Sequence, residues 1–485
     1  MRRILMGKVR KMAAATLCLA MAAGCLTGCG TTDGGSDSNT EADNTQTQEA
    51  TGGDKTSSGE KKGVINVWAF TDEVPKMIDL YVKNHPDFEY DINTTIVATT
   101  DGAYQPALDQ ALAAGGSDAP DIYCAESAFV LKYTQGDASS YAAAYEDLGI
   151  DVDNKISEAQ IAQYSVDIGT NPDGKVVGLG YQATGGCFIY RRSIAKDAFG
   201  TDDPAKVSEI IGGGSGNWDK FFEAAETLKG KGYGIVSGDG DIWHAVENSS
   251  DKGWIVDGKL YIDPKREEFM DMSKKLKDNG YYNDTQDWQD AWFADMKGEG
   301  EKGILGFFGP AWLINYTISP NCGGAAVGEG TFGDWAVCNP PVGFFWGGTW
   351  LLANKDTEKK EAVGEIIEWI TLNSTEDGLQ YAWANGTVDW DDDPNTATAK
   401  DSVASGAVMG ASDGSLDILG GQNMFDYFIP ANEYANGKNL TQYDETINQY
   451  WRDAVRTYTS GEKSKEEAIA GFKQNVQDNL DVVVE

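Results

Sequence analysis

Strands and helices alternate in the segment 63–127, and this alternation restricts the fold more than any other feature of the sequence. GVINVWAF (63–70), EYDINTTIV (89–97) and APDIYCAES (119–127) are short apolar runs that predict buried strands. Apolar residues between the first two runs recur at the spacing of one helical face: Val74, Met77, Ile78 and Tyr81. Between the second and third runs the corresponding residues are Ala107, Leu108, Ala111 and Leu112. Strand, helix, strand, helix, strand predicts a parallel α/β sheet flanked by helices.

The remainder of the body, which runs from Gly63 to Glu485, continues this mixture of strands and helices without an internal repeat. GILGFFGPAWLINY (303–316) predicts a strand that passes through Gly-Pro into a helix, and helices are expected over 218–229 and 264–278. A body of this length is too long to fold around a single small hydrophobic core, so two lobes are expected.

The N-terminus has the pattern of an export signal. Basic residues precede an apolar run over 12–23, which is shorter than the roughly 20 residues that span a bilayer. Leu26-Thr27-Gly28-Cys29 then resembles a bacterial lipobox, in which small residues fit the peptidase and the thiol accepts lipid. Cys25 matches this pattern less well because Ala22 stands where Leu26 gives an aliphatic residue. We predict a signal peptide at 1–28 and lipidation of Cys29; a plain signal peptide is the alternative.

The segment 29–62 is polar and contains no aromatic residue, so it predicts a flexible tether. Anchor and tether together predict a body held at the outer face of the cytoplasmic membrane, in a Gram-positive bacterium.

Charge and residue usage exclude several classes of protein. The net charge is −37, and the first 28 residues contribute five basic and no acidic side chains, so the mature chain is more acidic still. Nucleic acid is therefore not an expected partner, because phosphate binding requires clustered Lys and Arg. The chain has only His85 and His244, and it lacks zinc-ligand spacings and a phosphate-binding loop. We expect no metal, no cofactor and no catalytic triad.

Four cysteines lie in the body: Cys124, Cys187, Cys322 and Cys338. Outside the cell some could pair. A bridge between Cys322 and Cys338 would close a short loop, and buried free thiols are the alternative.

Aromatic and carboxylate residues gather where the predicted strands end. A pyranose has an apolar C–H face that aromatic rings cover and a rim of hydroxyls that carboxylates and amides bind. Strand ends are where α/β sheets place such groups. Candidate ligand-binding residues from the first, third and crossover strands are Trp68, Phe70, Asp72, Glu73, Glu126, Ser127, Tyr181 and Gln182. Candidates further along the chain are Asp241, Trp243, Phe308, Trp312 and Trp346.

These assignments have structural alternatives. Aromatic residues mostly fill cores, and Asp72 and Glu126 could cap helices. Trp288 and Trp292, four residues apart, would share a helical face that is either ligand-facing or core.

The order of several segments resembles the extracellular solute-binding lipoproteins of sugar ABC importers, the family that includes maltose-binding protein. The segments are INVWAF, APDIYCAES, GKVVGLGYQATGGCFIYRRSIAKDAFG, GILGFFGPAW, PPVGFFWGGTWLLANKDTEKKEAVGEIIEWI, ILGGQN and YTSGEKSKEEAIAGF. Together they cover nearly all of 63–485. The turn Tyr190-Arg191-Arg192 departs from the Tyr-Asn-Lys-like turn of the family.

The resemblance implies two discontinuous α/β lobes, a type II periplasmic-binding-protein-like fold, joined by a hinge of crossing strands. We expect lobe 1 at 63–175 and 339–373, and lobe 2 at 176–338 and 374–485. It also implies cleft positions near Glu126, Asp241 to Trp243, Phe308 to Trp312 and Asn423 to Phe425. The implied function is reversible capture of an oligosaccharide by a monomer, without catalysis, for delivery to an ABC permease.

Two other functions stay open from the sequence. A surface glycoside hydrolase needs only a pair of carboxylates, which the chain offers in excess, although the elements do not repeat eight times as in a barrel. A binder of peptides or polyamines would also suit the acidic composition.

Overall fold

The structure is a computed structural model that describes residues 61–99, 102–388 and 400–485. The predicted signal peptide, the predicted lipid site Cys29 and the tether up to residue 60 lie outside the described residues. Among the residues it describes, none of the helices combines the length and the apolar character needed to cross a membrane.

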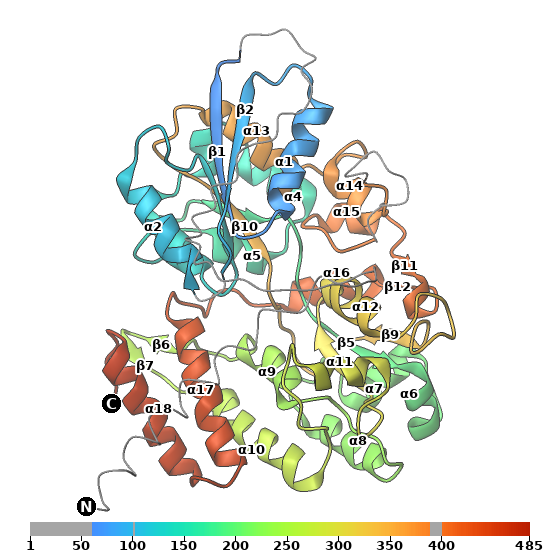
Figure 1. Ribbon diagram of the computed structural model, residues 1–485. Helices are drawn as coiled ribbons and strands as arrows, with labels where there is room; N and C mark the ends of the chain where they lie inside the picture. Colours follow the sequence, from blue (N-terminus) through green and yellow to red (C-terminus); the bar gives the residue numbers. More distant parts are fainter. Residues whose placement is uncertain (1–60, 100–101, 389–399) are drawn as a thin grey trace, which may run out of the picture. The chain divides into compact units, whose positions relative to one another are not determined.

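The first sheet has five strands in the order β2-β1-β3-β10-β4 (Figure 1). Its strands are β1 (Gly63–Ala69), β2 (Tyr90–Ile96), β3 (Ile122–Glu126), β4 (Gly178–Gly180) and β10 (Thr349–Ala353). β1 runs parallel to both β2 and β3, which confirms the parallel layout predicted for 63–127. β10 runs antiparallel to β3 and β4 and joins them.

Helices cover both faces of this sheet because its strands bury alternate residues on opposite sides. Ile65 and Val67 pack with Met77 of α1 (Glu73–Asn84) in one core cluster. Tyr123 packs with Leu108 of α2 (Tyr104–Ala114) in another. The apolar positions predicted for α1 are all buried, so the helical period identified the correct face.

The second sheet is antiparallel, with the order β8-β5-β9. Its strands are β5 (Cys187–Arg191), β8 (Gly306–Gly309) and β9 (Trp335–Cys338). The predicted strand within 303–316 is therefore present, and a six-residue π-helix, Leu313–Ile318, follows it. A separate core cluster, which includes Phe188 and Phe308, surrounds this sheet.

The remaining elements flank the two sheets. Before β4 the helices are α3 (Val130–Thr134), α4 (Val152–Ala159) and α5 (Gln163–Gly169). Between β5 and β9 lie α6 (Arg192–Phe199), α7 (Pro204–Ile211), α8 (Asp219–Lys229), α9 (Asp239–Glu247), β6 (Ile255–Val256), β7 (Lys259–Leu260), α10 (Pro264–Asn279), α11 (Asp290–Lys297) and α12 (Ser319–Asn321). After β10 come α13 (Lys360–Thr371), α14 (Leu379–Ala384), α15 (Gly406–Gly410), β11 (Ser415–Leu416), β12 (Gln422–Asn423), α16 (Phe425–Tyr434), α17 (Asp444–Thr459) and α18 (Lys465–Asn479).

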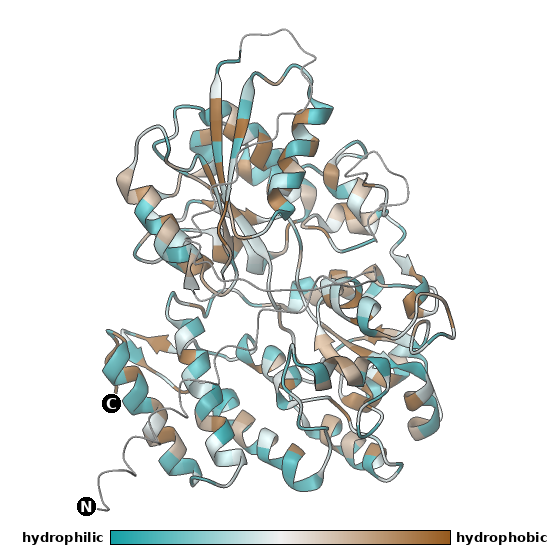
Figure 2. Cartoon of the chain, viewed as in Figure 1, coloured by the Kyte–Doolittle hydropathy of each residue, from teal (hydrophilic) through white to brown (hydrophobic). Residues whose placement is uncertain are grey.

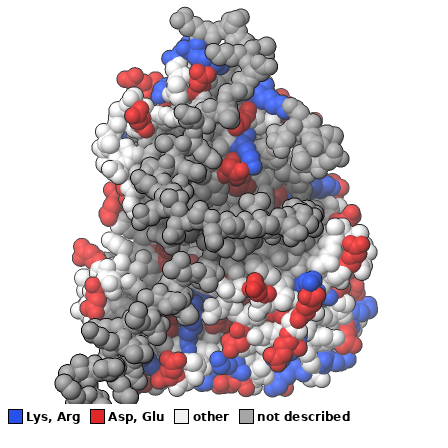
Figure 3. Space-filling view, viewed as in Figure 1, with Lys and Arg blue, Asp and Glu red and all other residues white. Residues whose placement is uncertain are grey.

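Hydropathy follows this arrangement. Hydrophobic residues concentrate on the strands, whereas α17 and α18 are largely hydrophilic along their visible faces (Figure 2). On the face shown in Figure 3, outside the grey atoms, acidic and basic side chains alternate over the surface. The four cysteines of the body are buried free thiols, so the structure has no bridge between Cys322 and Cys338.

Two crossing segments connect the sheets and lie against each other. The first follows β4 and the second precedes β10. Gly185 forms a β-bridge with Phe345, and the Gly186 N–H donates to the Phe344 carbonyl at 2.9 Å. A Cβ atom on Gly186 would lie 2.0 Å from the Phe344 ring, so only glycine permits this close approach. The sheet membership supports discontinuous lobes, and their boundaries stay a prediction.

Candidate functional site

A cavity of about 310 Å³ is lined by four segments that are distant in the sequence. Glu126 and Ser127 follow β3 of the first sheet, and Trp346 belongs to the second crossing segment. Trp243 comes from α9 and Asp444 from α17. The cavity therefore joins the end of a strand in one sheet, a crossing segment and helices beside the other sheet, as expected for a ligand site in an α/β fold.

Aromatic rings form one wall next to this cavity. The His244 ring stacks on Trp346 with ring centroids 3.5 Å apart and planes 15° apart. Trp312 meets Trp346 edge-on at 4.8 Å, and its indole N–H donates to the Trp346 carbonyl at 3.1 Å. Trp288 lies parallel to Trp312 at 6.2 Å. We call His244, Trp288, Trp312 and Trp346 the aromatic wall.

Trp288 is the exposed member of the aromatic wall. Its side chain is 51% exposed, and its φ of +64° lies in the left-handed region that large residues rarely adopt. A costly backbone conformation that presents an exposed indole is typical of a functional position rather than a core position. The helix α11 begins only at Asp290, so Trp288 and the buried Trp292 do not share a helical face.

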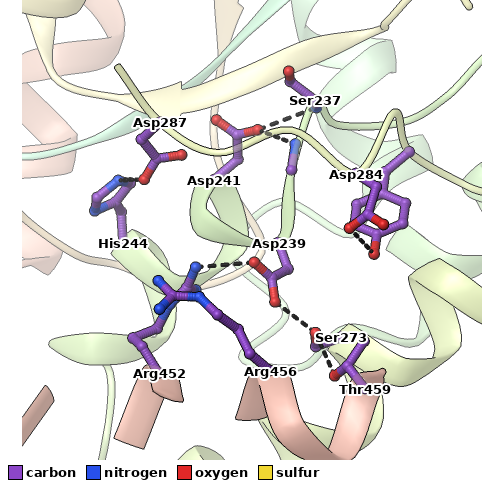
Figure 4. A network of polar contacts seen from close by, with 12 residues as sticks. Ser237, Asp239, Asp241, His244, Ser273, Asp284, Asp287, Arg452, Arg456 and Thr459 are labelled. Carbon is purple, nitrogen blue, oxygen red and sulfur yellow. Dashed lines mark hydrogen bonds and ion pairs between the residues drawn. The ribbon is translucent and has the colours of Figure 1, made fainter. Parts of the chain in front are cut away.

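Polar contacts fix the helix that carries His244 and the loop that carries Trp288, two members of the aromatic wall (Figure 4). Asp241 lies in the first turn of α9 and accepts hydrogen bonds from the backbone N–H groups of Ser237 and Gly238 at 3.1 and 2.9 Å. One turn later, His244 Nε2 lies 3.0 Å from Asp287 Oδ2. Burial, and then the neighbouring Asp287, raise the pKa of Asp241 well above its usual range. Asp241 thus anchors the helix start, and Asp287 holds the imidazole against Trp346.

Four carboxylates line the cavity: Glu126, Glu247, Asp444 and Glu445. Burial raises the pKa of Glu126 and of Glu445, and the Glu445 carboxylate, a like charge, raises the pKa of Glu126 further. Burial also raises the pKa of Glu247 to about 7 and that of Asp444 to about 6. The cavity therefore holds carboxyl groups whose charged forms are poorly solvated.

One arginine lines the same cavity. The Arg452 guanidinium donates to Asp239 at 2.9 Å and lies over the rings of Trp243 and Phe269. Among the described residues, no group of three or more metal-ligating side chains is close enough to hold a metal ion. The site thus offers aromatic faces, carboxylates and one guanidinium for binding, and these groups suit a polar organic ligand.

The structure brings together some of the residues predicted from the sequence. Glu126, Ser127, Trp243 and Trp346 line the cavity, and Trp312 packs on Trp346. Trp68 and Phe70 are half-buried against the core cluster that contains Tyr104 and Phe129.

A second group of predicted residues lies together where the first crossing segment leaves β4. The Tyr181 hydroxyl donates to Glu73, and its ring stacks on Trp383 with centroids 5.6 Å apart. Burial raises the pKa of Glu73. Gln182 is buried close to Asp401, which is fully buried and whose pKa burial raises to about 7.

Four predicted residues make contacts that are structural. Phe308 is fully buried among Phe188, Trp218 and Phe221 in the core of the second sheet. Asn423 accepts from the Phe425 N–H at 3.0 Å at the start of α16, and Asp72 pairs with Lys76 at 2.7 Å on the surface. Asp241 anchors α9, as described above. The assignment of these four to a ligand site stays a prediction.

Sequence reasoning missed several lining residues: His244, Glu247, Asp444, Glu445 and Arg452. His244 was available as one of only two histidines, next to the selected Trp243. The α17 residues carry a weaker signal. Asp444, Asn448 and Arg452 recur every four residues and form a polar stripe on α17.

Comparisons with known proteins agree with this architecture. A family model described as bacterial extracellular solute-binding protein matches residues 69–377. No curated protein sequence matches the chain. A crystal structure of an extracellular solute-binding protein of family 1 superposes with a TM-score of 0.68 at 18% identity, covering 86% of this chain and 99% of that one.

Two further solved structures contain carbohydrate. The galacto-N-biose/lacto-N-biose I-binding protein of an ABC transporter from Bifidobacterium longum, solved with lacto-N-biose, has a TM-score of 0.61 at 14% identity and covers 88% of this chain and 100% of its own. An ABC substrate-binding protein from Listeria monocytogenes, solved with cycloalternan, has a TM-score of 0.59 at 15% identity and covers 86% of this chain and 99% of its own. At these identities the similarity shows a shared two-lobed fold.

Proposed function

This chain belongs to the family of bacterial extracellular solute-binding proteins, and from that premise we propose that it captures an oligosaccharide for an ABC importer. The observation that carries the proposal is the cavity walled by Trp346 and lined by carboxylates from segments beside both sheets. Stacked rings cover the apolar face of a pyranose, and carboxylates accept its hydroxyls. The structural relatives bound to lacto-N-biose and cycloalternan support a carbohydrate over the peptide and polyamine alternatives.

The proposed mechanism is closure of the two lobes around the sugar. The ligand contacts Glu126 beside the first sheet and Trp243 beside the second only when both lie against it, so binding shifts the population toward the closed state. The two crossing segments around Gly186 and Phe345 would absorb the motion. No covalent step is required, and the hydrolase alternative lacks support from the family match.

Location and partners belong to the same proposal. Family membership places the protein outside the cytoplasm. We infer further that Cys29 carries lipid, that residues 29–62 tether a monomeric body to the membrane, and that the closed body docks on a permease. Treatment of the producing cells with a labelled fatty acid tests the anchor: Cys29→Ala should abolish labelling and release the protein into the medium.

Binding of intact sugar is the central test. Malto-, xylo- and manno-oligosaccharides are titrated by calorimetry, and the products are analysed by chromatography. A sugar at one hundred times its Kd should stabilise the protein by about 2.7 kcal/mol without being cleaved. Conversion of the sugar to shorter products would favour the hydrolase instead.

Trp346→Ala should weaken binding of that sugar at least tenfold, because removal of a stacked indole costs roughly 1.4 kcal/mol or more. Tyr434→Ala is the matched control, since Tyr434 is a 68% exposed aromatic residue outside the cavity lining. Equal losses in the two variants would contradict the assigned site.

A further inference from the structure

The cavity of the proposed function holds more negative charge than its own basic groups neutralise. Glu126, Glu247, Asp444 and Glu445 line it, and Asp444 acts on Glu247 as a like charge. Glu445 acts in the same way on Glu126. These carboxylates come from β3, α9 and α17, so they surround the cavity rather than lie along one edge.

The basic groups nearby are already engaged with other carboxylates or carbonyls. Arg452 donates to Asp239 at 2.9 Å, and His244 pairs with Asp287 at 3.0 Å. The Arg266 guanidinium lies over the Trp254 ring, 4.2 Å from its centroid, and donates to the carbonyls of Lys252 and Glu247. Its charge also acts on Asp444 and Glu247. Arg452 thus has its own counter-charge in Asp239, and the four lining carboxylates outnumber the basic side chains of the cavity, which leaves a deficit of positive charge.

A metal ion does not fit this deficit. Chelation requires several oxygen ligands around one point, and no such group exists among the described residues. Dispersed carboxylates instead suit positive groups that are spaced along an organic ligand.

Independent features of the same cavity point to a hydroxylated ligand. The side chain of Trp243 is 4% exposed and lines the cavity. Asn248 Oδ1 and Arg452 Nη1 are buried atoms of lining residues, and neither has a hydrogen-bond partner among the described residues. One donor and one acceptor therefore remain for the hydroxyl or ring oxygens of a ligand.

We propose that the ligand is an oligosaccharide of amino sugars whose protonated amines lie among Glu126, Glu247, Asp444 and Glu445. This inference rests on the proposed function and narrows its ligand class. Hydroxyls would bind the unpaired Arg452 Nη1 and Asn248 Oδ1, and the rings of Trp346 and Trp288 would cover the C–H faces. An ammonium beside an indole also gains cation–π attraction.

The test compares three oligosaccharides that differ only at carbon 2 of each ring: a glucosamine trimer, its N-acetylated form and cellotriose. Calorimetry of the full protein is performed at pH 7.5 in 50 mM and 500 mM salt. The same panel includes the neutral malto-, xylo- and manno-oligosaccharides, and also spermidine. The glucosamine trimer should bind at least tenfold tighter than every neutral sugar, and high salt should reduce this preference because it screens the charges.

Glu247→Gln should lower the ratio of amino-sugar to neutral-sugar affinity about tenfold. Gln keeps an oxygen that accepts from Asn448 Nδ2, which lies 2.5 Å from Glu247 Oε1, so the fold is expected to survive. Glu223→Gln removes an exposed carboxylate on α8, outside the cavity lining, and should leave the ratio unchanged.

Each result decides between the two proposals. A neutral sugar that binds as tightly as the amino sugar overturns the amino-sugar inference and leaves the proposed function standing. Binding of spermidine alone, or of nothing in the panel, overturns both. An unchanged ratio in Glu247→Gln also overturns the inference, since the carboxylate would then not contact the amine.

Discussion

Asp401 shows how burial sets the behaviour of one side chain. It is fully buried and accepts from the Ser402 N–H at 2.7 Å, and it lies near Glu73. Burial is the main cause that raises its pKa to about 7, and the hydrogen bonds only partly oppose it. The folded protein therefore favours the protonated form of Asp401 over a pH range in which the unfolded chain is ionised.

Asp401→Asn should stabilise the protein at pH 8 and should have little effect at pH 4. The folded-state pKa of Asp401 lies above the unfolded value of about 4. The contribution of Asp401 to stability is therefore greatest below pH 4 and is lost as the pH rises through about 7. The variant removes this loss, which we expect to raise the free energy of unfolding by about 2 kcal/mol at pH 8. Urea unfolding at both pH values measures the difference, and equal gains at the two pH values would contradict a protonation origin.

At the scale of elements, the crossing segments depend on a close contact that a single glycine allows. Gly186 donates to the Phe344 carbonyl, and the Phe344 ring occupies the space of a side chain at that position. The neighbouring Phe345 stacks on Tyr164 at 4.7 Å and accepts from Asn248 at 3.0 Å. One crossing segment thus contacts residues beside both sheets.

Gly186→Ala should lower the free energy of unfolding by about 2 kcal/mol, because the added methyl group displaces the Phe344 ring. Gly410→Ala is the matched control, since a Cβ there meets no atom within 4 Å. Both are compared by urea unfolding. A loss in the control as large as that in Gly186→Ala would show that the steric contact with Phe344 is not responsible.

The sequence predicted the elements that depend on local pattern. The strands at 63–70, 89–97 and 119–127, the buried face of α1, and the helices at 218–229 and 264–278 are present, because hydrophobic period reports burial directly. Glu126 was found because it follows a predicted strand. The sequence did not predict that His244 pairs with Asp287 or that α17 approaches Glu126. These contacts join segments 43 or more residues apart, and the local sequence pattern does not indicate contacts at such a separation.

At the scale of the molecule, ligand binding should make the protein more compact. The cavity is lined by groups beside both sheets, and two crossing segments connect the sheets. We therefore expect X-ray scattering to show a smaller radius of gyration when the sugar identified by calorimetry is added. Trp346→Ala, which retains the crossing segments, should require a higher sugar concentration for the same change. A radius that stays constant at saturation would contradict closure.

The position of β10 between β3 and β4 has a consequence for how such a protein matures. Residues 181–348 separate β4 from β10 in the sequence, yet β3 and β4 are joined in the sheet only through β10. A chain that leaves the cell N-terminus first would expose the edges of β3 and β4 until that whole stretch had been translocated. During this interval, unpaired apolar edges are vulnerable to aggregation and proteolysis. Completion of the first sheet is therefore a late event of secretion, and a chain truncated before residue 349 should be degraded rather than accumulate as a half-sized binding module.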